Sequence, residues 1–236
     1  MTTIYALLAP LWPHAETSER IKTLIERWQR DLDAKDRYSG RHAIVAALLA
    51  AELAARLDLK REQVSALWLA GQLYDLGKIS VPEHILGKHG SLSVAEMLAV
   101  RNHVSFGYDL LRDWELWRTS PKWLPQEVLD TVLHHHERWD GQGYPRGLKG
   151  KQIPFHARLM AIVDAYSSMI MDTPYRSSKG EERALQEIEA NAGLQFDPYL
   201  VRDFVGMLRK WRITGRGLVI PSSPELVLPS VNGQAA

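Results

Sequence analysis

Apolar residues recur every three or four positions along most of the chain, and this spacing predicts helices rather than strands. An early example is the segment whose apolar positions alternate with charged ones: Ile21, Leu24, Ile25, Trp28 and Leu32. Thr17 or Ser18 is its predicted N-cap. An amphipathic helix of this kind packs on the core of its own domain or on a second subunit, and the pattern alone leaves both alternatives open.

Two helices that follow are apolar on most faces, which predicts that they are buried. Residues 40–57, after a capping Ser39, are rich in Ala and Leu, and residues 61–76 carry apolar positions up to Gly77. Further helices are expected to begin at Ser or Pro residues or at Asp-Pro, and their starts are Ser91 or Ser93, Pro125, Pro154, Ser177 or Ser178, and Asp197 with Pro198. The last should end near Trp211. Residues 141–153 hold four glycines and should form a loop.

Composition narrows the classes of protein that fit. The chain has 236 residues with 45% apolar content, enough for a full core. Its 29 basic and 28 acidic residues give no electrostatic reason to expect a nucleic-acid partner. The apolar run 4–12 is broken by Pro10 and is too short to span a bilayer, so no membrane span and a cytoplasmic location are expected.

The chain contains no Cys, so any metal site must use His and carboxylate ligands. The richest stretch for such a site is HHHERWDGQGYP at 134–145, where three imidazoles fall at the end of a predicted helix before a Gly-rich turn. Neutral imidazole is a common metal ligand, and side chains at a helix end can converge on one ion. The pattern therefore indicates a metal centre.

Six blocks of the chain resemble, in order, the motifs of the HD-GYP domain, a branch of the HD phosphohydrolases that hydrolyses cyclic di-GMP in bacteria. They are YDLGK at 74–78, His103 with Gly107, HHERWDGQGYP at 135–145, RLMAIVDAY at 158–166, PYR at 174–176 and FDP at 196–198. The resemblance covers roughly residues 38–205.

This resemblance implies an all-α fold, an HD-domain bundle of about seven or eight helices. It also implies three parts of the chain: an N-terminal extension with one amphipathic helix at 1–35, the HD-GYP domain at 36–212, and a flexible C-terminal tail at 213–236.

The resemblance further implies two divalent metal ions, with Fe or Mn ahead of Zn. The ligands carried over by motif are His42, Asp75, His103, His135, His136 and Asp164. In the family, one ion is held by the early His, the His-Asp pair and the late Asp. The other is held by the bridging Asp with the isolated His and the two adjacent His residues. His134 is an extra, expected outside the ligand set.

Four departures from the family pattern concern these sites. Tyr74 replaces the His of the His-Asp pair, which should weaken one metal site. Tyr38 stands where some members have an acidic ligand, which disfavours a third ion. Ser167 and Thr173 replace an Asp and an Arg near the ligand-binding edge.

The function implied by the resemblance is hydrolysis of cyclic di-GMP to pGpG and on to GMP. Two ions would activate a water molecule and clamp the attacking and leaving oxygens at phosphorus. Asp75 and Lys78 are the expected catalytic residues, and the expected substrate-binding residues are Lys78, Tyr144, Arg146 and Arg176. The alternatives are a catalytically degenerate module that binds a cyclic dinucleotide or a signalling protein, and a hydrolase for another nucleotide. A homodimer or a signalling partner is the expected protein contact.

Overall fold

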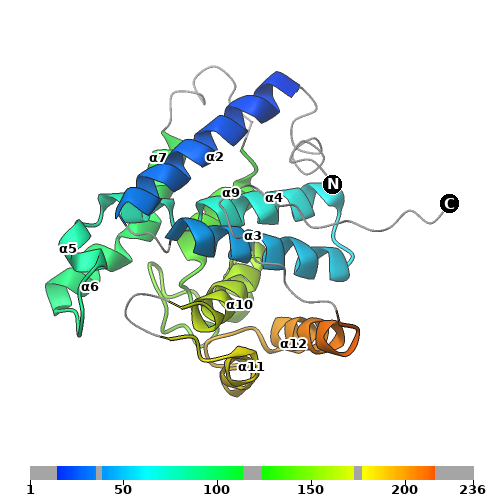
Figure 1. The fold of residues 1–236 in the computed structure, drawn as a ribbon. Coiled ribbons are helices and arrows are strands. Elements are labelled where there is room, and N and C mark those ends of the chain that lie inside the picture. The colour runs from blue at the N-terminus through cyan, green and yellow to red at the C-terminus, as the bar shows by residue number, and fades with distance from the viewer. Residues whose placement is uncertain (1–14, 36–38, 114–123, 173–176, 216–236) are drawn as a thin grey trace.

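The computed structural model describes residues 15–35, 39–113, 124–172 and 177–215, and it contains no β-strand within these ranges. Helices follow one another along the whole described chain (Figure 1). The predicted all-α class is therefore confirmed. Within the same ranges, no helix combines the length and the apolar character needed to cross a membrane.

The centre of the fold is the pair formed by α3 (Ser39–Arg56) and α4 (Arg61–Leu73). Both helices are buried over most of their length, as their Ala- and Leu-rich sequences predict. They approach closely because Gly71 faces the backbone of Ala47, where an added Cβ would lie only 2.4 Å from the Ala47 Cα. Helices α9 (Gln126–His134) and α10 (Phe155–Ile170) pack against this pair and complete the core.

Helix α2 (Ala15–Lys35) crosses the molecule beside α3 (Figure 1). Its residues Ile25 and Leu32 are buried, and the side chain of Gln29 donates a hydrogen bond to the buried side chain of Gln72 in α4. At the end of α2, Lys35 Nζ donates to the carbonyl oxygen of Ile79. The amphipathic face thus packs on the core of its own domain, which is one of the two alternatives that the sequence left open.

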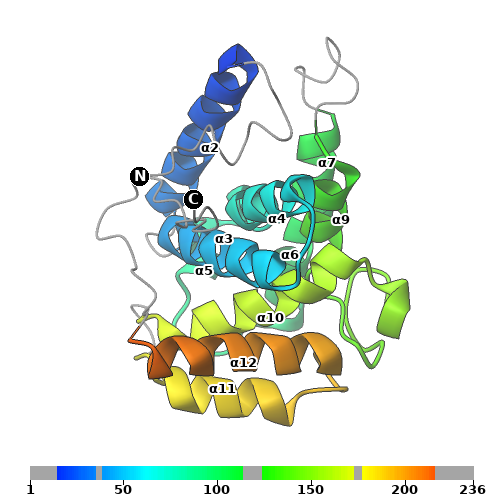
Figure 2. The same cartoon turned by 90° about the vertical axis from the view of Figure 1, so that its right-hand side faces the viewer.

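Helices α11 (Glu181–Ala190) and α12 (Pro198–Ile213) lie side by side against α10 at one end of the molecule (Figure 2). Asp197 caps α12 as predicted, since its carboxylate accepts from the backbone N–H of Tyr199. The predicted cap of α11 is wrong. Ser178 forms a turn ahead of the helix, accepting from the N–H of Gly180, and Gly180 itself is the N-cap residue.

Two segments between α4 and α9 depart from the predicted pattern. The helix expected over 61–76 stops at Leu73, and a 3₁₀ segment, η1 (Leu76–Ser80), follows it. After the short α5 (Glu83–Leu86), α6 (Val94–Arg101) is capped by Ser93, yet it has no buried residue. Helix α7 (His103–Arg112) then returns to the core beside η1.

The proposed division of the chain stays a prediction at both ends. Residues 1–14 and 216–236 lie outside the described residues. Within the described residues, α12 continues to Ile213, close to the predicted end of the domain at 212.

Candidate metal centre

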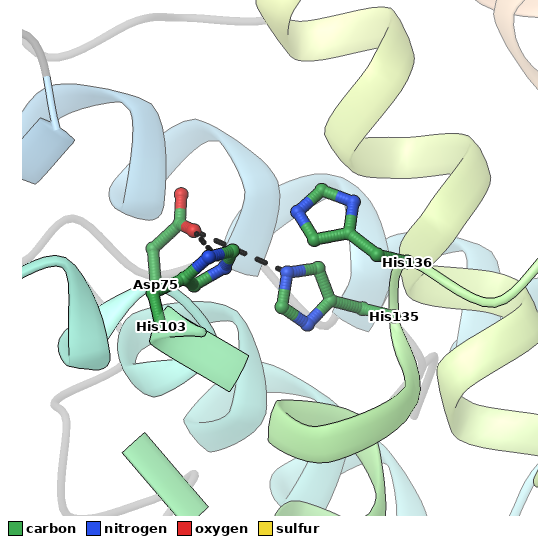
Figure 3. A group of neighbouring side chains, drawn as sticks. All are labelled: Asp75, His103, His135 and His136. Carbon is green, nitrogen blue, oxygen red and sulfur yellow. Dashed lines mark ion pairs between the residues drawn. The ribbon is translucent and has the colours of Figure 1, made fainter. Parts of the chain in front are cut away.

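Four side chains from distant parts of the sequence point toward one another in the interior: Asp75, His103, His135 and His136 (Figure 3). Their ligand atoms all lie within 4.8 Å of one another. Asp75 follows the end of α4, His103 is the first residue of α7, and the two adjacent histidines follow the end of α9. Three helix termini therefore meet at one point, and we call these four residues the Asp75 cluster.

The position of Asp75 depends on close contact between η1 and α7. A Cβ added to Gly77 would lie 1.9 Å from the carbonyl oxygen of His103 and 2.7 Å from the backbone nitrogen of Gly107. No other residue fits between these two backbones without moving them apart. This contact brings Asp75, two residues before Gly77, against His103.

Backbone carbonyls fix the orientation of two of the imidazoles. His103 Nδ1 lies 2.6 Å from the carbonyl oxygen of Val100. His135 Nδ1 lies 3.2 Å from the carbonyl oxygen of Thr131 and 3.1 Å from that of Val132. Because a carbonyl oxygen can only accept, each Nδ1 must carry a proton, and in the neutral ring each Nε2 is left with a lone pair. A metal-binding histidine is commonly held in this way by its second nitrogen.

These lone pairs face an acceptor rather than a donor. His103 Nε2 lies 3.3 Å from Asp75 Oδ1, and His135 Nε2 lies 4.0 Å from the same oxygen. All three atoms are buried, and none has a hydrogen-bond partner within the described chain. Three buried acceptors without a donor are costly unless a cation lies among them. The donor set fits a divalent metal ion of borderline character.

Lys78 adds a positive charge at the edge of the cluster. Its Nζ donates to Asp75 Oδ2 at 2.7 Å, and its side chain is 23% exposed. Burial opposes ionisation of Asp75, but the charge of Lys78 outweighs it and holds the pKa of Asp75 well below its usual range. Asp75 is therefore a carboxylate at neutral pH.

Burial acts in the opposite direction on the histidines, because it disfavours their charged form. Together with the nearby His103, burial lowers the pKa of His136 to about 3. Burial, with His136 and His103 nearby, also lowers the pKa of His135 well below its usual value. Both rings are neutral at physiological pH, which is the form that binds a metal.

A second set of potential ligands, His42, Asp75 and Asp164, shares the Asp75 carboxylate. Here two hydroxyl groups lie among the ligand atoms. Tyr74 Oη donates to Asp164 Oδ1 at 2.9 Å and lies 3.1 Å from His42 Nδ1. On the other side of the ring, Ser167 Oγ lies 2.7 Å from His42 Nε2. We call these four residues, His42, Tyr74, Asp164 and Ser167, the Tyr74 network.

The loop after α9 covers the histidine end of the cluster. The ring of Tyr144 stacks on His136 with centroids 4.9 Å apart, and the guanidinium of Arg101 lies 5.1 Å from the Tyr144 centroid. Glu137 holds this loop, because its buried carboxylate accepts from the N–H groups of Arg146 at 2.7 Å and Leu148 at 3.0 Å.

The structure thus brings together all six predicted metal ligands, with Lys78 and Tyr144 beside them. Arg146 is exposed and contributes its backbone N–H to Glu137. Arg176 and Thr173 lie outside the described residues. His134, expected outside the ligand set, is buried with Nδ1 3.6 Å from Glu137 Oε1.

Sequence reasoning missed Arg101 and Glu137. Glu137 lies within the histidine-rich stretch and gave a usable signal, since a Glu directly before a Gly-rich loop can accept from its N–H groups. Arg101 gave none, because only the packing of α6 beside the loop brings it to Tyr144.

A sequence model of the HD domain family matches residues 20–200. The chain is 33% identical over 171 residues to a cyclic di-GMP phosphodiesterase of Thermotoga maritima, covering 72% of this chain and 45% of that one. It is 37% identical over 174 residues to a cyclic di-GMP phosphodiesterase of Pseudomonas aeruginosa, covering 74% and 40%. A 3′3′-cGAMP-specific phosphodiesterase of Vibrio cholerae is 31% identical over 183 residues, covering 78% and 34%. The chain therefore spans less than half the length of these relatives.

Two solved structures share the fold. A cyclic GMP-AMP specific phosphodiesterase of V. cholerae superimposes with a TM-score of 0.59 at 20% identity, over 83% of this chain and 50% of that one. An HDG"Y"P protein from Bdellovibrio bacteriovorus gives a TM-score of 0.57 at 20% identity, over 71% and 51%. Both likenesses support the helical architecture described above.

Proposed function

Because this chain belongs to the HD domain family, in the HD-GYP branch that its motifs resemble, we propose that it is a metal-dependent phosphodiesterase for a cyclic dinucleotide. The observation that carries the proposal is the Asp75 cluster, in which three buried acceptor atoms face one another without a donor. Cyclic di-GMP is the first candidate substrate, since named relatives act on it. The expected products are pGpG and then GMP.

The proposed ligands are Asp75, His103, His135 and His136, and the proposed ion is Fe or Mn, with Zn as the third candidate. A divalent ion bound there supplies a Lewis acid that activates water and polarises a phosphate oxygen. The second ion expected from the sequence would use His42 and Asp164, and it stays a prediction.

The residues around the cluster would prepare the substrate for attack. Lys78, partly exposed beside Asp75, is placed to neutralise charge on a phosphate oxygen. Tyr144 covers His136, and burial, together with the charges of Asp75 and Asp164, raises its pKa, so that its phenol remains a hydrogen-bond donor. Arg101 lies over the same ring, 5.1 Å from its centroid, where it can meet a second phosphate. Arg146 and Arg176, named from the motifs, remain proposed substrate contacts, as do the cytoplasmic location and a homodimer or signalling partner.

A cyclic GMP-AMP substrate is the second candidate, because 3′3′-cGAMP-specific enzymes are among the named relatives. The two substrates differ in one base, so discrimination between them depends on contacts to that base rather than on the metal centre. A direct comparison of the two turnover rates decides between them.

The test is an assay of the purified chain, reconstituted with Mn²⁺ or with Fe²⁺ under anaerobic conditions, against cyclic di-GMP and 3′3′-cGAMP. Products are separated by liquid chromatography. We expect conversion of at least one substrate, and none by the Asp75→Asn variant. A metal-loaded chain that converts neither substrate would overturn the proposal and favour the catalytically degenerate binding module. Calorimetric titration with each dinucleotide would then show whether that module binds one.

A further inference from the structure

The two sets of potential metal ligands share Asp75, but they differ in whether their ligand atoms already form hydrogen bonds. In the Asp75 cluster, carbonyl oxygens take the Nδ1 protons of His103 and His135, and the Nε2 atoms have no hydrogen-bond partner within the described chain. In the Tyr74 network, both ring nitrogens of His42 face hydroxyl groups, Tyr74 Oη at 3.1 Å and Ser167 Oγ at 2.7 Å.

A hydroxyl group can both donate and accept, which makes the Tyr74 network satisfied without a metal. Because the Tyr74 hydroxyl donates its proton to Asp164, Nδ1 of His42 carries the ring proton and donates to Tyr74 Oη, and Ser167 Oγ donates to Nε2. Asp164 Oδ1 receives a hydrogen bond from Tyr74 at 2.9 Å. A metal ion in this set would have to displace these contacts, whereas an ion in the Asp75 cluster would meet ligand atoms that have no hydrogen-bond partner within the described residues.

The ring of Tyr74 also takes the space between the two sets. It is fully buried and makes edge contacts with His135, centroids 4.9 Å apart, and with His42, centroids 6.2 Å apart. A phenol placed here offers no imidazole lone pair, and its hydroxyl is committed to Asp164. The second set therefore lacks one ligand and has another two engaged by hydrogen bonds.

We propose that this chain holds a single metal ion, in the Asp75 cluster, and that the Tyr74 network closes the second metal site with hydrogen bonds. The inference rests on the metal centre of the proposed function but not on its substrate. With one ion in place of two, Lys78 carries a larger share of the charge neutralisation at the substrate phosphate.

The test is the metal content of the full chain after reconstitution with Mn²⁺, removal of unbound metal and elemental analysis, together with the electron paramagnetic resonance spectrum. The wild type should hold about one ion per chain, since one ligand set is open, and should show the spectrum of isolated Mn²⁺. Tyr74→His supplies the missing imidazole and removes the hydroxyl, so it should raise the content to about two ions with an exchange-coupled spectrum.

Two further variants separate the ligand sets. Asp164→Asn keeps the side-chain shape and should leave the content at about one ion, whereas His103→Ala should abolish binding. Circular dichroism shows whether each variant is folded, and the wild-type count needs no variant at all. Two ions in the wild type, loss of an ion in Asp164→Asn, or no gain in a folded Tyr74→His would each overturn the inference. A wild type that binds no Mn²⁺ would instead refute the proposed metal centre itself. A chain that holds one ion but has no turnover would refute only the proposed activity.

Discussion

Asp75 Oδ1 lies 3.3 Å from His103 Nε2, although α5 and α6 separate the two residues in the sequence. Both facing atoms are acceptors when the ring of His103 is neutral, since its one proton then lies on Nδ1 and is donated to the Val100 carbonyl. Such a pair is stable in a buried site only when something positive lies between the two atoms. This relationship is the basis for the expected effects of changes at the site.

Asp75→Asn should remove metal binding and activity together. The amide is neutral and leaves the three imidazoles with a weaker ligand. Loss of a residue that only supports a metal ligand costs roughly 10–100-fold in metal affinity, so loss of this ligand should cost more than about 100-fold. Elemental analysis and a competition titration with a chelator measure the affinity. Retained metal at wild-type affinity would contradict the role assigned to Asp75.

Gly77→Ala should disturb the same pair without touching a ligand. The new Cβ would meet backbone atoms of His103 and Gly107 that cannot rotate away, and overpacking of this kind costs about 1–3 kcal/mol of stability. As α7 moves from η1, His103 leaves Asp75, and metal affinity should fall by roughly 10–100-fold. Thermal unfolding and metal titration follow the two effects.

Gly206→Ala is the matched control for this change. A Cβ at Gly206 in α12 meets nothing within 4 Å, so the same substitution should stabilise the helix by about 0.5–1 kcal/mol and leave metal affinity unchanged. Equal behaviour of the two variants would mean that the η1 to α7 contact does not position the site.

The metal-free protein should lose stability as the pH falls below about 6.5, the ordinary pKa of histidine. The buried ring of His136 has a pKa of about 3 in the folded chain, against 6.5 when exposed. Between these values the unfolded chain binds a proton that the folded chain does not, so the free energy of unfolding decreases as the pH falls through this window. Above the window the contribution of His136 to stability is fully present. The buried His42 and His135 shift in the same direction.

Thermal unfolding of chelator-treated protein between pH 7 and pH 5 measures this effect. A loss of about 1 kcal/mol would lower Tm by roughly 2–4 °C in a chain of this size. His136→Gln should flatten the dependence, whereas the same change at the exposed His84 should leave it as it is. A wild-type Tm that rises toward pH 5 would contradict the sign.

The sequence predicted the helices well because apolar periodicity and capping residues are local features. It could not predict the exposure of α6, where Val94 is 81% and Leu98 61% exposed, because periodicity marks an apolar face without showing what covers it. The sequence also did not predict that α4 ends at Leu73. That end is followed by η1, which packs on α7, a contact between segments some thirty residues apart.

The candidate site likewise has features that the sequence predicted and features that it could not predict. Motif order identified the residues of the Asp75 cluster, and the structure shows that they meet. The sequence showed that Tyr74 replaces a ligand and predicted a weakened metal site, but it did not show the hydrogen bonds that Tyr74 forms with Asp164 and His42. Ser167, 125 positions from His42, completes the Tyr74 network only after α10 packs on α3, and no local pattern reports that contact.

Glu137→Gln should loosen the loop that carries Tyr144 while leaving the metal in place. The carboxylate accepts two backbone N–H groups, at 2.7 and 3.0 Å, and an amide can replace only one of these oxygens. The unsatisfied donor should cost about 1–3 kcal/mol of stability. We expect KM to rise by roughly tenfold, equivalent to about 1.4 kcal/mol of substrate binding, with unchanged metal content. Glu62→Gln, at an exposed position of α4, is the control and should change neither. An unchanged KM would show that the loop does not contact substrate.

Lys78→Met should separate charge neutralisation from metal binding, because Lys78 contacts Asp75 but is not itself a ligand. The new side chain keeps the aliphatic stem and removes the ammonium 2.7 Å from Asp75 Oδ2. Without a positive charge on the substrate phosphate, kcat should fall by roughly 100–1,000-fold, the range seen when one donor to a developing charge is removed. Metal content should stay at the wild-type level, since Asp75 and the three histidines remain. Lys78→Arg restores the charge with a different shape and should recover part of the lost kcat. If Lys78→Met instead lost the metal and kept kcat per bound ion, Lys78 would serve to hold Asp75 in place, and the phosphate would have to be neutralised by Arg101 or another cation.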